Sequence, residues 1–373
     1  MANLKAPVRV YRTFPKVGRH VHYIDPVEGN PRNGEGSFIR LANGDIMHVY
    51  SRYVGQDYHD DCRAEIAGII SRDEGETWGQ PFTILPCPEG ARNLMSVSML
   101  RLGNGDIGLG YIQKEDYEGF VICRYMLVRS ADEGKTWSEP VSCIEDPDRY
   151  IINNDRIIRL QNGDILFCAA IHPIAEKLSK LTNEKITRGV ARFFRSADDG
   201  RTFTDQGIVL CAPFDGTDPT GLQEPGLFQF EDGRIWVYFR TRLGCQYVSY
   251  SDDGGYTWSP VVPDFRFTSP RSPMLVKTVG KYTVAVFNPV PENAFNPAPF
   301  GMDRTPLMLS VSEDGGLTFP RSYLLEDDPR NAYCYPAIIE CEGGFLVSYY
   351  DSNGSGIFLH GTRITKVSFD EIK

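Results

Sequence analysis

Three aspartates that lie within five positions of one another are the first residues in this sequence that could do chemistry. Asp57, Asp60 and Asp61 occur in the polar segment VGQDYHDDCRAEI. Two neighbouring carboxyl groups raise each other's pKa, so one of an adjacent pair can stay protonated near neutral pH. A protonated carboxyl group can act as a general acid. We therefore expect Asp60 or Asp61 to be an acid/base residue, with Asp57 as the remaining candidate.

A second set of polar side chains combines an amide, a carboxylate, a guanidinium and an imidazole. The segment INNDRIIRL supplies Asn154, Asp155 and Arg156, and AAIHP supplies His172. Together these groups can hydrogen-bond several hydroxyl groups of one ligand. His172 could also transfer a proton, because an imidazole titrates near neutral pH.

Arginines at two further places could bind a ligand. Arg271 lies in FTSPRSPMLV, where the neighbouring prolines fix the backbone and suit a preorganised contact with an anion. Arg92 and Asn93, in RNLMSVSML, stand at the place in their repeat that corresponds to Asn154 and Asp155. We expect Arg271 and Arg92 to contribute to substrate binding.

A repeated turn must position these residues. The motif Ser-x-Asp-x-Gly-x-Thr-aromatic begins at Ser71, Ser130, Ser196, Ser251 and Ser312. Its aspartate can accept hydrogen bonds from backbone N–H groups and its glycine can take a positive φ. We assign these roles to Asp73, Asp132, Asp198, Asp252 and Asp314, and to Gly75, Gly134, Gly200, Gly254 and Gly315. The aromatic residues Trp78, Trp137, Phe203, Trp258 and Phe319 would fill the gaps between units. Five equivalent turns around a ring cannot converge on one substrate, so we interpret the motif as scaffold.

A second repeat gives the number of units. Apolar strands flank Asn-Gly, Asp-Gly or Gly-Gly in RLANGDI, RLGNGDI, RLQNGDI and FEDGRI, and weaker copies lie near Gly280 and Gly343. Such dipeptides between β-rich runs predict tight hairpins. With a further strand before each Ser/Asp/Gly turn, each unit becomes a sheet of about four strands. The sequence therefore predicts an all-β fold, a six-bladed β-propeller of four-stranded antiparallel blades.

We expect the propeller to be a single domain that spans residues 1–373. The last blade lacks the Ser/Asp/Gly turn, so the early strand VRVYRTF, Val8 to Phe14, is free to complete it and close the ring. Helix is expected only in IAEKLSKLTNEKI, Ile174 to Ile186, as an insertion over one face.

The composition limits the classes of partner. A net charge of −10 argues against a nucleic-acid partner, which needs clustered Lys and Arg. No apolar run reaches the length of a signal peptide or a membrane helix, which predicts a cytoplasmic protein with no membrane partner. The nine cysteines form no CxxC pair, which is typical of buried reduced thiols. We expect no metal and no cofactor, and the chain could form a homo-oligomer.

With these turns in a six-bladed propeller, the sequence resembles the sialidase (neuraminidase) superfamily over essentially its whole length. The resemblance implies a catalytic site on the inner strands, on the face opposite the repeated turns, which that family calls Asp boxes. Sialidases use an acid/base Asp from the first blade, a Tyr nucleophile paired with a Glu, and three arginines that grip the substrate carboxylate.

Two segments carry the resemblance at the level of single residues. LQEPGLFQFEDGRIWVYFRT is similar to a sialidase segment and implies Glu224 as the activating carboxylate and Arg240 as one of the arginines. YCYPAIIECEGGFLVSYYD implies Tyr335 as the nucleophile, and Tyr333, on the same face of the strand, is the alternative. The pairing is chemically sensible because a phenol, with an ordinary pKa of about 10, needs a neighbouring base to attack.

The first blade departs from the family pattern. Where sialidases have Arg-Ile-Pro, this chain reads NPRNGEGSFIRLANGD, with Glu35 between two glycines and no arginine in register. Arg32 would have to reach in from the preceding loop. A bidentate arginine is among the strongest carboxylate-binding groups. Its absence weakens the case for sialic acid and makes Glu35 a candidate substrate-binding residue.

The resemblance implies a glycoside hydrolase that cleaves a terminal sugar, expected to be acidic, from a glycan with retention and without a cofactor. One alternative is a different exo-glycosidase, or a lyase acting on an acidic sugar, in which Glu35, Asp155 or His172 replace the missing parts. The other is a glycan-binding propeller without catalysis. All three hypotheses predict a carbohydrate partner.

Overall fold

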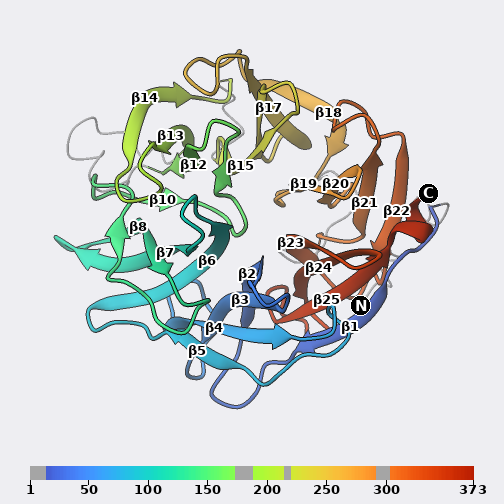
Figure 1. The fold of residues 1–373 in the computed structure, drawn as a ribbon, viewed down its shortest axis with the longest axis horizontal. Coiled ribbons are helices and arrows are strands. Elements are labelled where there is room, and N and C mark those ends of the chain that lie inside the picture. The colour runs from blue at the N-terminus through green and yellow to red at the C-terminus, as the bar shows by residue number, and fades with distance from the viewer. Residues whose placement is uncertain (1–13, 173–187, 214–219, 291–302) are drawn as a thin grey trace, which may run out of the picture.

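Six antiparallel sheets follow one another around a central axis (Figure 1). This computed structural model describes residues 14–172, 188–213, 220–290 and 303–373. Each sheet is one blade, and in the first five blades the first strand in sequence lies nearest the axis (Figure 1). The six-bladed all-β propeller predicted from the hairpin repeats is therefore confirmed.

The strands of the first three blades are as follows. Blade one contains β2 (Asn33–Arg40), β3 (Ile46–Tyr53), β4 (Ala64–Ser71) and β5 (Phe82–Leu85). Blade two contains β6 (Ala91–Arg101), β7 (Ile107–Tyr117), β8 (Phe120–Ser130) and β9 (Val141–Ser142). In blade three, β10 (Tyr150–Ile151) and β11 (Ile158–Arg159) both pair with β12 (Ile165–Ile171), and β13 (Val190–Ser196) and β14 (Thr204–Leu210) follow.

The other three blades complete the ring. Blade four contains β15 (Gln223–Gln229), β16 (Ile235–Arg240), β17 (Cys245–Ser251) and β18 (Val262–Thr268). Blade five contains β19 (Leu275–Val279), β20 (Tyr282–Phe287), β21 (Leu307–Ser312) and β22 (Arg321–Glu326). Blade six contains β23 (Tyr333–Cys341), β24 (Gly344–Asp351), β25 (Gly361–Ser368) and, on its outer side, β1 (Arg19–Ile24). The 3₁₀ helix η2 (Phe369–Ile372) follows β25.

The outer strand of blade six comes from the N-terminal part of the chain. β1 pairs antiparallel with β25, from Arg19 opposite Lys366 to Ile24 opposite Thr362. This strand lies further along the chain than the expected Val8–Phe14, of which only Phe14 is among the described residues. The helix expected at residues 174–186 lies outside the described residues.

The hydrophobic core lies between the blades. Each aromatic residue of the repeated turn packs back against the preceding blade, as predicted: the ring of Trp258 stacks 4.3 Å from Phe193, and Phe319 lies 5.2 Å from Phe267. All nine cysteines are free, and all except Cys62 and Cys211 are buried. Along the described ranges, no helix has both the length and the apolar composition needed to cross a membrane.

The repeated turns have the same hydrogen bonds in all five copies. In the first copy Ser71 Oγ accepts from Gly75 N at 2.8 Å, and Asp73 accepts from Thr77 N at 2.8 Å. Each turn follows the third strand of its blade. Because strands one and three of an antiparallel sheet run in the same direction, these turns lie at the opposite edge from the start of the inner strands.

Two of these turns correct the residue assignments made from the sequence. In blade four Asp253, and not Asp252, accepts from the N–H groups of Tyr256 and Thr257, both at 2.9 Å. The N–H groups that bind the serine belong to Gly255 and Gly316, and not to Gly254 and Gly315. The register, with Asp two and Gly four residues after Ser, decides between adjacent residues of the same type.

Asp253 and Asp252 form a matched pair for testing this turn. We expect Asp253→Ala to lower the free energy of unfolding by about 1 kcal/mol, as loss of a capping oxygen does in helices. We expect Asp252→Ala to change it by less than about 0.5 kcal/mol, as for surface substitutions in general. Urea denaturation of both variants measures the difference, and equal losses would contradict the corrected register.

Candidate active site

Strained backbone at the inner strands turns polar side chains toward one another. Five non-glycine residues there have a positive φ: Glu35 (53°), Ser96 (59°), Asp155 (57°), Glu224 (43°) and Tyr335 (58°). Four of them lie at register shifts in β2, β6, β15 and β23. Such bulges redirect a side chain and are common beside functional sites. Residues that alternation would separate are thereby brought together.

Tyr335, Glu224 and Arg240 form the centre of this cluster. Tyr335 Oη donates to Glu224 Oε1 at 2.9 Å. Arg240 Nη1 donates to the same carboxylate oxygen and lies 3.4 Å from Tyr335 Oη. Glu224 is the second residue of β15, next to Gln223, which lies opposite Arg240 at the end of β16, so the hairpin places Glu224 beside Arg240. Three residues implied by the family resemblance are therefore in contact.

The environment sets opposite protonation states for the tyrosine and the glutamate. Burial raises the pKa of Tyr335 far above its ordinary value, and the Glu224 charge raises it further. Burial also disfavours the charged form of Glu224, but Arg240, together with Arg304 and the hydrogen bond from Tyr335, outweighs burial and holds the pKa of that carboxyl below its ordinary value. Tyr335 therefore keeps its proton, and Glu224 is an ionised acceptor placed to receive it.

The bulge explains why Tyr335 is in the site and Tyr333 is not. Regular alternation would put both on one face of β23. The register of β23 shifts between Cys334 and Ala337, with Tyr335 at positive φ. Tyr333 instead packs 6.1 Å from Tyr349, and its hydroxyl accepts from Asn331 at 3.2 Å.

Arg304 is a site residue that the sequence analysis missed. Its guanidinium is buried and lies 5.3 Å from the centre of the Tyr335 ring. Nη1 contacts Cys334 Sγ at 3.1 Å, and Nη2 donates to the carbonyl of Arg271 at 3.0 Å. Arg271, the predicted arginine of this blade, thus supports Arg304 through its main chain. The signal in the sequence was the position of Arg304 in its repeat. Arg304 lies just before β21, the third strand of blade five, as Asp60 lies just before β4, the third strand of blade one.

Arg32 reaches the site from the loop before β2, although blade one has no arginine in the register expected from the sequence. Only 1% of its surface is exposed. Nε donates to Tyr350 Oη at 2.8 Å, Nη1 to Asp60 Oδ1 at 2.6 Å, and Nη2 to Glu35 Oε1 at 2.7 Å. The guanidinium also lies over the Tyr53 ring at 4.4 Å. Arg32 therefore reaches the site from the loop before β2, between two carboxylates.

Asp60 is the carboxylate of its loop that reaches this group. Lys114 Nζ donates to Asp60 O at 2.7 Å and contacts Asp61 Oδ1 at 3.3 Å, so Asp61 faces the lysine. Asp57 accepts from the N–H group of Tyr58 within its own exposed turn. Partial burial opposes the charge of Asp60, but Arg32 and then Lys114 lower its pKa to about 2. The expectation that adjacent carboxylates keep Asp60 protonated is therefore wrong for the free protein.

Glu35 is a second buried carboxyl group beside the centre of the site. Its Oε2 accepts from Ser96 Oγ at 2.6 Å, and only 4% of the residue is exposed. Burial raises its pKa even though Arg32 opposes that shift. Glu35 and Ser96 both have positive φ, so their contact joins the bulges of blades one and two.

The blade-three residues brace the ring. Asn154 Nδ2 donates to the carbonyls of Gly36 at 2.7 Å and Pro336 at 3.2 Å. Asp155 accepts from Ser37 Oγ at 2.9 Å and from Lys277 Nζ at 2.8 Å. These contacts link the inner strands of blades one, three, five and six.

Three other predicted residues contact residues outside the Tyr335 cluster. Arg156 Nη1 donates to Tyr238 Oη at 3.0 Å. Arg92 forms an ion pair with Asp116 at 2.7 Å, with 37% of its side chain exposed. His172 packs against Gly189 in blade three, where an added Cβ on the glycine would lie 2.8 Å from the imidazole. Asn93, and not Arg92, supports the acid loop, because its Nδ2 donates to the carbonyl of Asp60 at 2.5 Å.

Substitution of Asp155 tests its structural role. We expect Asp155→Ala to lower the free energy of unfolding by about 2 kcal/mol, because it removes the acceptor of several partly buried hydrogen bonds. Lys277→Met should cost less than about 1 kcal/mol, because 38% of the lysine side chain is exposed and such ion pairs are weak. Urea denaturation measures both losses. An equal loss in Lys277→Met would show that the ion pair, and not the bracing, dominates.

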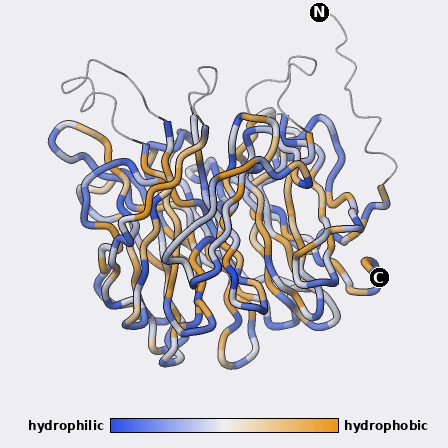
Figure 2. Tube along the Cα trace, turned by 90° about the horizontal axis from the view of Figure 1, so that it is seen from above, coloured by the Kyte–Doolittle hydropathy of each residue, from blue (hydrophilic) through white to orange (hydrophobic). Residues whose placement is uncertain are grey.

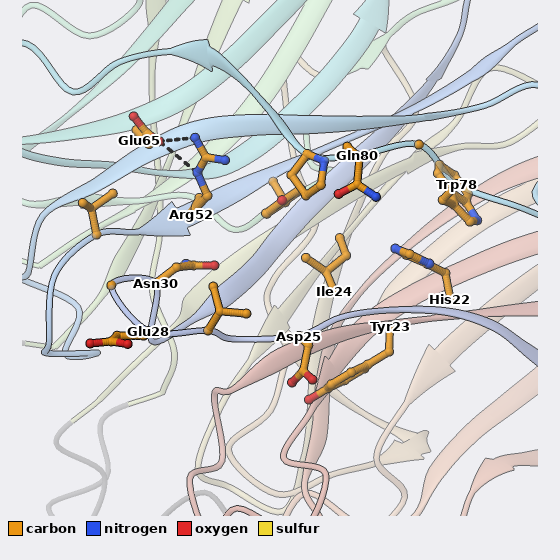
Figure 3. A pocket seen from close by; sticks show the side chains of 16 residues that line it. His22, Tyr23, Ile24, Asp25, Glu28, Asn30, Arg52, Glu65, Trp78 and Gln80 are labelled. Atoms are coloured by element: carbon orange, nitrogen blue, oxygen red, sulfur yellow. Dashed lines mark hydrogen bonds and ion pairs between the residues drawn. The ribbon is translucent and has the colours of Figure 1, made fainter.

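A groove on the outer side of the ring is separate from this cluster. It lies between β1 of blade six and blade one, and Figure 3 shows His22, Trp78, Gln80 and Asp25 around it. None of its lining residues belongs to the Tyr335 cluster. In the ranges that the structure describes, no group of three or more His, Cys, Asp or Glu side chains could hold a metal ion.

Comparison with known proteins agrees with this fold. Residues 60–347 match the family described as "BNR repeat-like domain". No curated protein matches the sequence. A Dyadobacter fermentans protein of unknown function superposes with a TM-score of 0.71 at 17% identity, over 94% of this chain and 99% of that one.

Two sialidase structures have similar architecture. The intramolecular trans-sialidase of Ruminococcus gnavus, in complex with oseltamivir carboxylate, gives a TM-score of 0.68 at 14% identity, over 95% of this chain and 98% of that one. Trypanosoma rangeli sialidase, with 2,3-difluorosialic acid as a covalent intermediate, gives 0.66 at 14% identity, over 95% and 58% of the two chains. These likenesses establish a sialidase-like propeller fold.

Proposed function

Because the chain belongs to the family of BNR repeat-like domains, we propose that the Tyr335 cluster is the active site of a retaining exo-glycosidase that removes a terminal acidic sugar from a glycan. The observation that carries this proposal is the 2.9 Å hydrogen bond from Tyr335 Oη to the ionised, buried Glu224. A phenol beside a carboxylate base is an activated nucleophile.

In the first step Tyr335 Oη attacks the anomeric carbon while its proton passes to Glu224. The glycosidic oxygen leaves with a proton from Asp60. In the second step a water loses a proton to Asp60 and attacks the same carbon, and Tyr335 departs with the proton held by Glu224. Two displacements give net retention, as in other glycosidases that form a covalent intermediate.

Arginines around the tyrosine support recognition of an acidic sugar. Arg240 and Arg304 are buried within reach of Tyr335, and Arg32 donates to its neighbour Tyr350. The rings of Tyr335 and Tyr350 are 5.9 Å apart. Buried guanidinium groups bind carboxylates strongly because the fork geometry of the two groups matches.

Glu35 supports a second candidate substrate. By pairing with Arg32 it reduces the positive charge available to a ligand carboxylate. An acidic sugar other than sialic acid, such as a uronic acid, is therefore the alternative substrate of the same machinery. A panel of 4-methylumbelliferyl glycosides that includes the α-sialoside, uronides and neutral sugars distinguishes the two.

Removal of the phenolic oxygen should abolish turnover and leave binding intact. We expect Tyr335→Phe to lower kcat by at least about 10³-fold on the 4-methylumbelliferyl glycoside that the unsubstituted protein hydrolyses, because no nucleophile remains. The affinity for a product-like sugar should change by less than about threefold, because the ring stays in place. Fluorescence release and calorimetric binding measure the two quantities. Full turnover by Tyr335→Phe would overturn the assignment of the nucleophile.

Arg304 and Arg92 provide a matched pair of arginines. We expect Arg304→Ala to weaken binding of an acidic sugar by about 10- to 100-fold, the value of a hydrogen-bonded charge contact. Arg92→Ala should leave kcat/KM unchanged, because Arg92 pairs with Asp116 outside the cluster. Steady-state kinetics on the same glycoside measure both. A loss in Arg92→Ala as large as that in Arg304→Ala would contradict the placement of the anion site.

A further inference from the structure

Arg32 has little hydrogen-bonding capacity left in the free protein. A guanidinium has five N–H donors. Nε donates to Tyr350, Nη1 to Asp60 and to the carbonyl of Tyr58 at 3.2 Å, and Nη2 to Glu35. Four donors are therefore used. A ligand carboxylate can bind this arginine through two hydrogen bonds only if one of these partners leaves.

Asp60 is the partner that can leave. Its side chain is 60% exposed and lies in the loop between β3 and β4, so moving it into water costs little. Glu35 is 4% exposed, is fixed by the bulge of β2 and accepts from Ser96. Displacing Glu35 would leave a charged group buried without its cation, which is costly.

The exchangeable contact lies beside the place where the sugar would bind. Arg32 contacts Tyr350, whose ring is 5.9 Å from that of Tyr335. The charge of Arg304, which lies over the Tyr335 ring, also acts on Asp60. An acidic sugar seated at Tyr335 and Arg304 is therefore next to the Arg32–Asp60 pair.

We propose that Arg32 couples ligand binding to the protonation of Asp60: the ligand carboxylate replaces Asp60 on Arg32, and the released Asp60 takes up the proton that it then gives to the leaving group. This inference rests on the proposed function. The proton comes from solvent, and the complex gains one proton for each ligand bound. Arg32 binds the ligand directly, and its effect on the proton transfer passes through Asp60.

The exchange explains how Asp60 can donate a proton in the complex although it is ionised in the free protein. An aspartate whose pKa is held at about 2 is a poor acid near neutral pH. Once released, it loses its strongest cationic contact and gains the ligand carboxylate as a neighbour, and both changes raise its pKa. The other ionisable groups near Asp60 are the basic side chains of Lys114 and Arg304 and the carboxyl groups of Asp61 and Glu35.

The direction of the linkage follows from this change. Because Asp60 binds a proton more tightly in the complex than in the free protein, ligand binding takes up protons. Affinity for the acidic ligand therefore rises as pH falls toward the pKa of the free Asp60. Glu35 faces Arg32 from the other side and could also take up a proton, so it needs its own control variant.

Isothermal titration calorimetry of the full chain tests this coupling. The probe is 2,3-didehydro-2-deoxy-N-acetylneuraminic acid, and its methyl ester is the uncharged control. Titrations at about pH 5, above the ordinary aspartate pKa, in two buffers of different ionisation enthalpy give the number of protons taken up. The proteins compared are the unsubstituted chain, Asp60→Asn and Glu35→Gln.

We expect proton uptake by the unsubstituted chain and by Glu35→Gln, and none by Asp60→Asn. Asp60→Asn should bind the acid about tenfold more tightly at neutral pH, because an amide holds Arg32 less strongly than a carboxylate does. The methyl ester should bind the unsubstituted chain and Asp60→Asn with equal affinity.

Two outcomes would overturn the inference in different ways. If the acid binds the unsubstituted chain, but Asp60→Asn binds it no more tightly and takes up the same number of protons, the coupling is wrong and the proposed function stands. If no protein in the set binds the acid, sialic acid is not the sugar that this site recognises, and the coupling, which needs this carboxylate on Arg32, fails with it.

Discussion

A buried carboxylate stays ionised only when a cation compensates for its lost hydration, and Arg240 is that cation for Glu224. The other features of the site depend on this pair. It provides an acceptor for the Tyr335 proton inside a cluster where burial alone would keep every acid neutral. It also fixes the position of the phenol, because Arg240 and Glu224 both contact Tyr335 Oη.

The propeller separates the scaffold from the chemistry. The repeated turns close the ends of the third strands, and the inner strands begin at the opposite edge of each blade. The aromatic rings between blades fix how neighbouring blades pack, and contacts such as those of Asn154 and Asp155 join inner strands across the ring. Blade position therefore decides which side chains meet at the axis, and substitutions there can change the chemistry without changing the fold.

The repeats made the fold predictable from the sequence, because hairpin dipeptides and Ser/Asp/Gly turns are local signals. The site was predictable only in part. Tyr335, Glu224 and Arg240 stand beside such signals, so the family resemblance aligned them. Arg304 and Arg32 lie in loops, and their positions depend on tertiary contacts with Cys334, Asp60 and Glu35. The low pKa of Asp60 could not be predicted because its cause, Arg32, is 28 residues away in the chain.

Trapping the covalent intermediate tests the role of Tyr335 most directly. 2,3-Difluorosialic acid is incubated with the protein, and the protein is then analysed by intact mass and peptide mapping. We expect one sugar added per chain, attached to Tyr335, and none in Glu224→Gln over the same time. Turnover of the sialoside with no adduct on Tyr335, or an adduct on a carboxylate instead, would contradict the central claim that Tyr335 is the nucleophile and Glu224 its base.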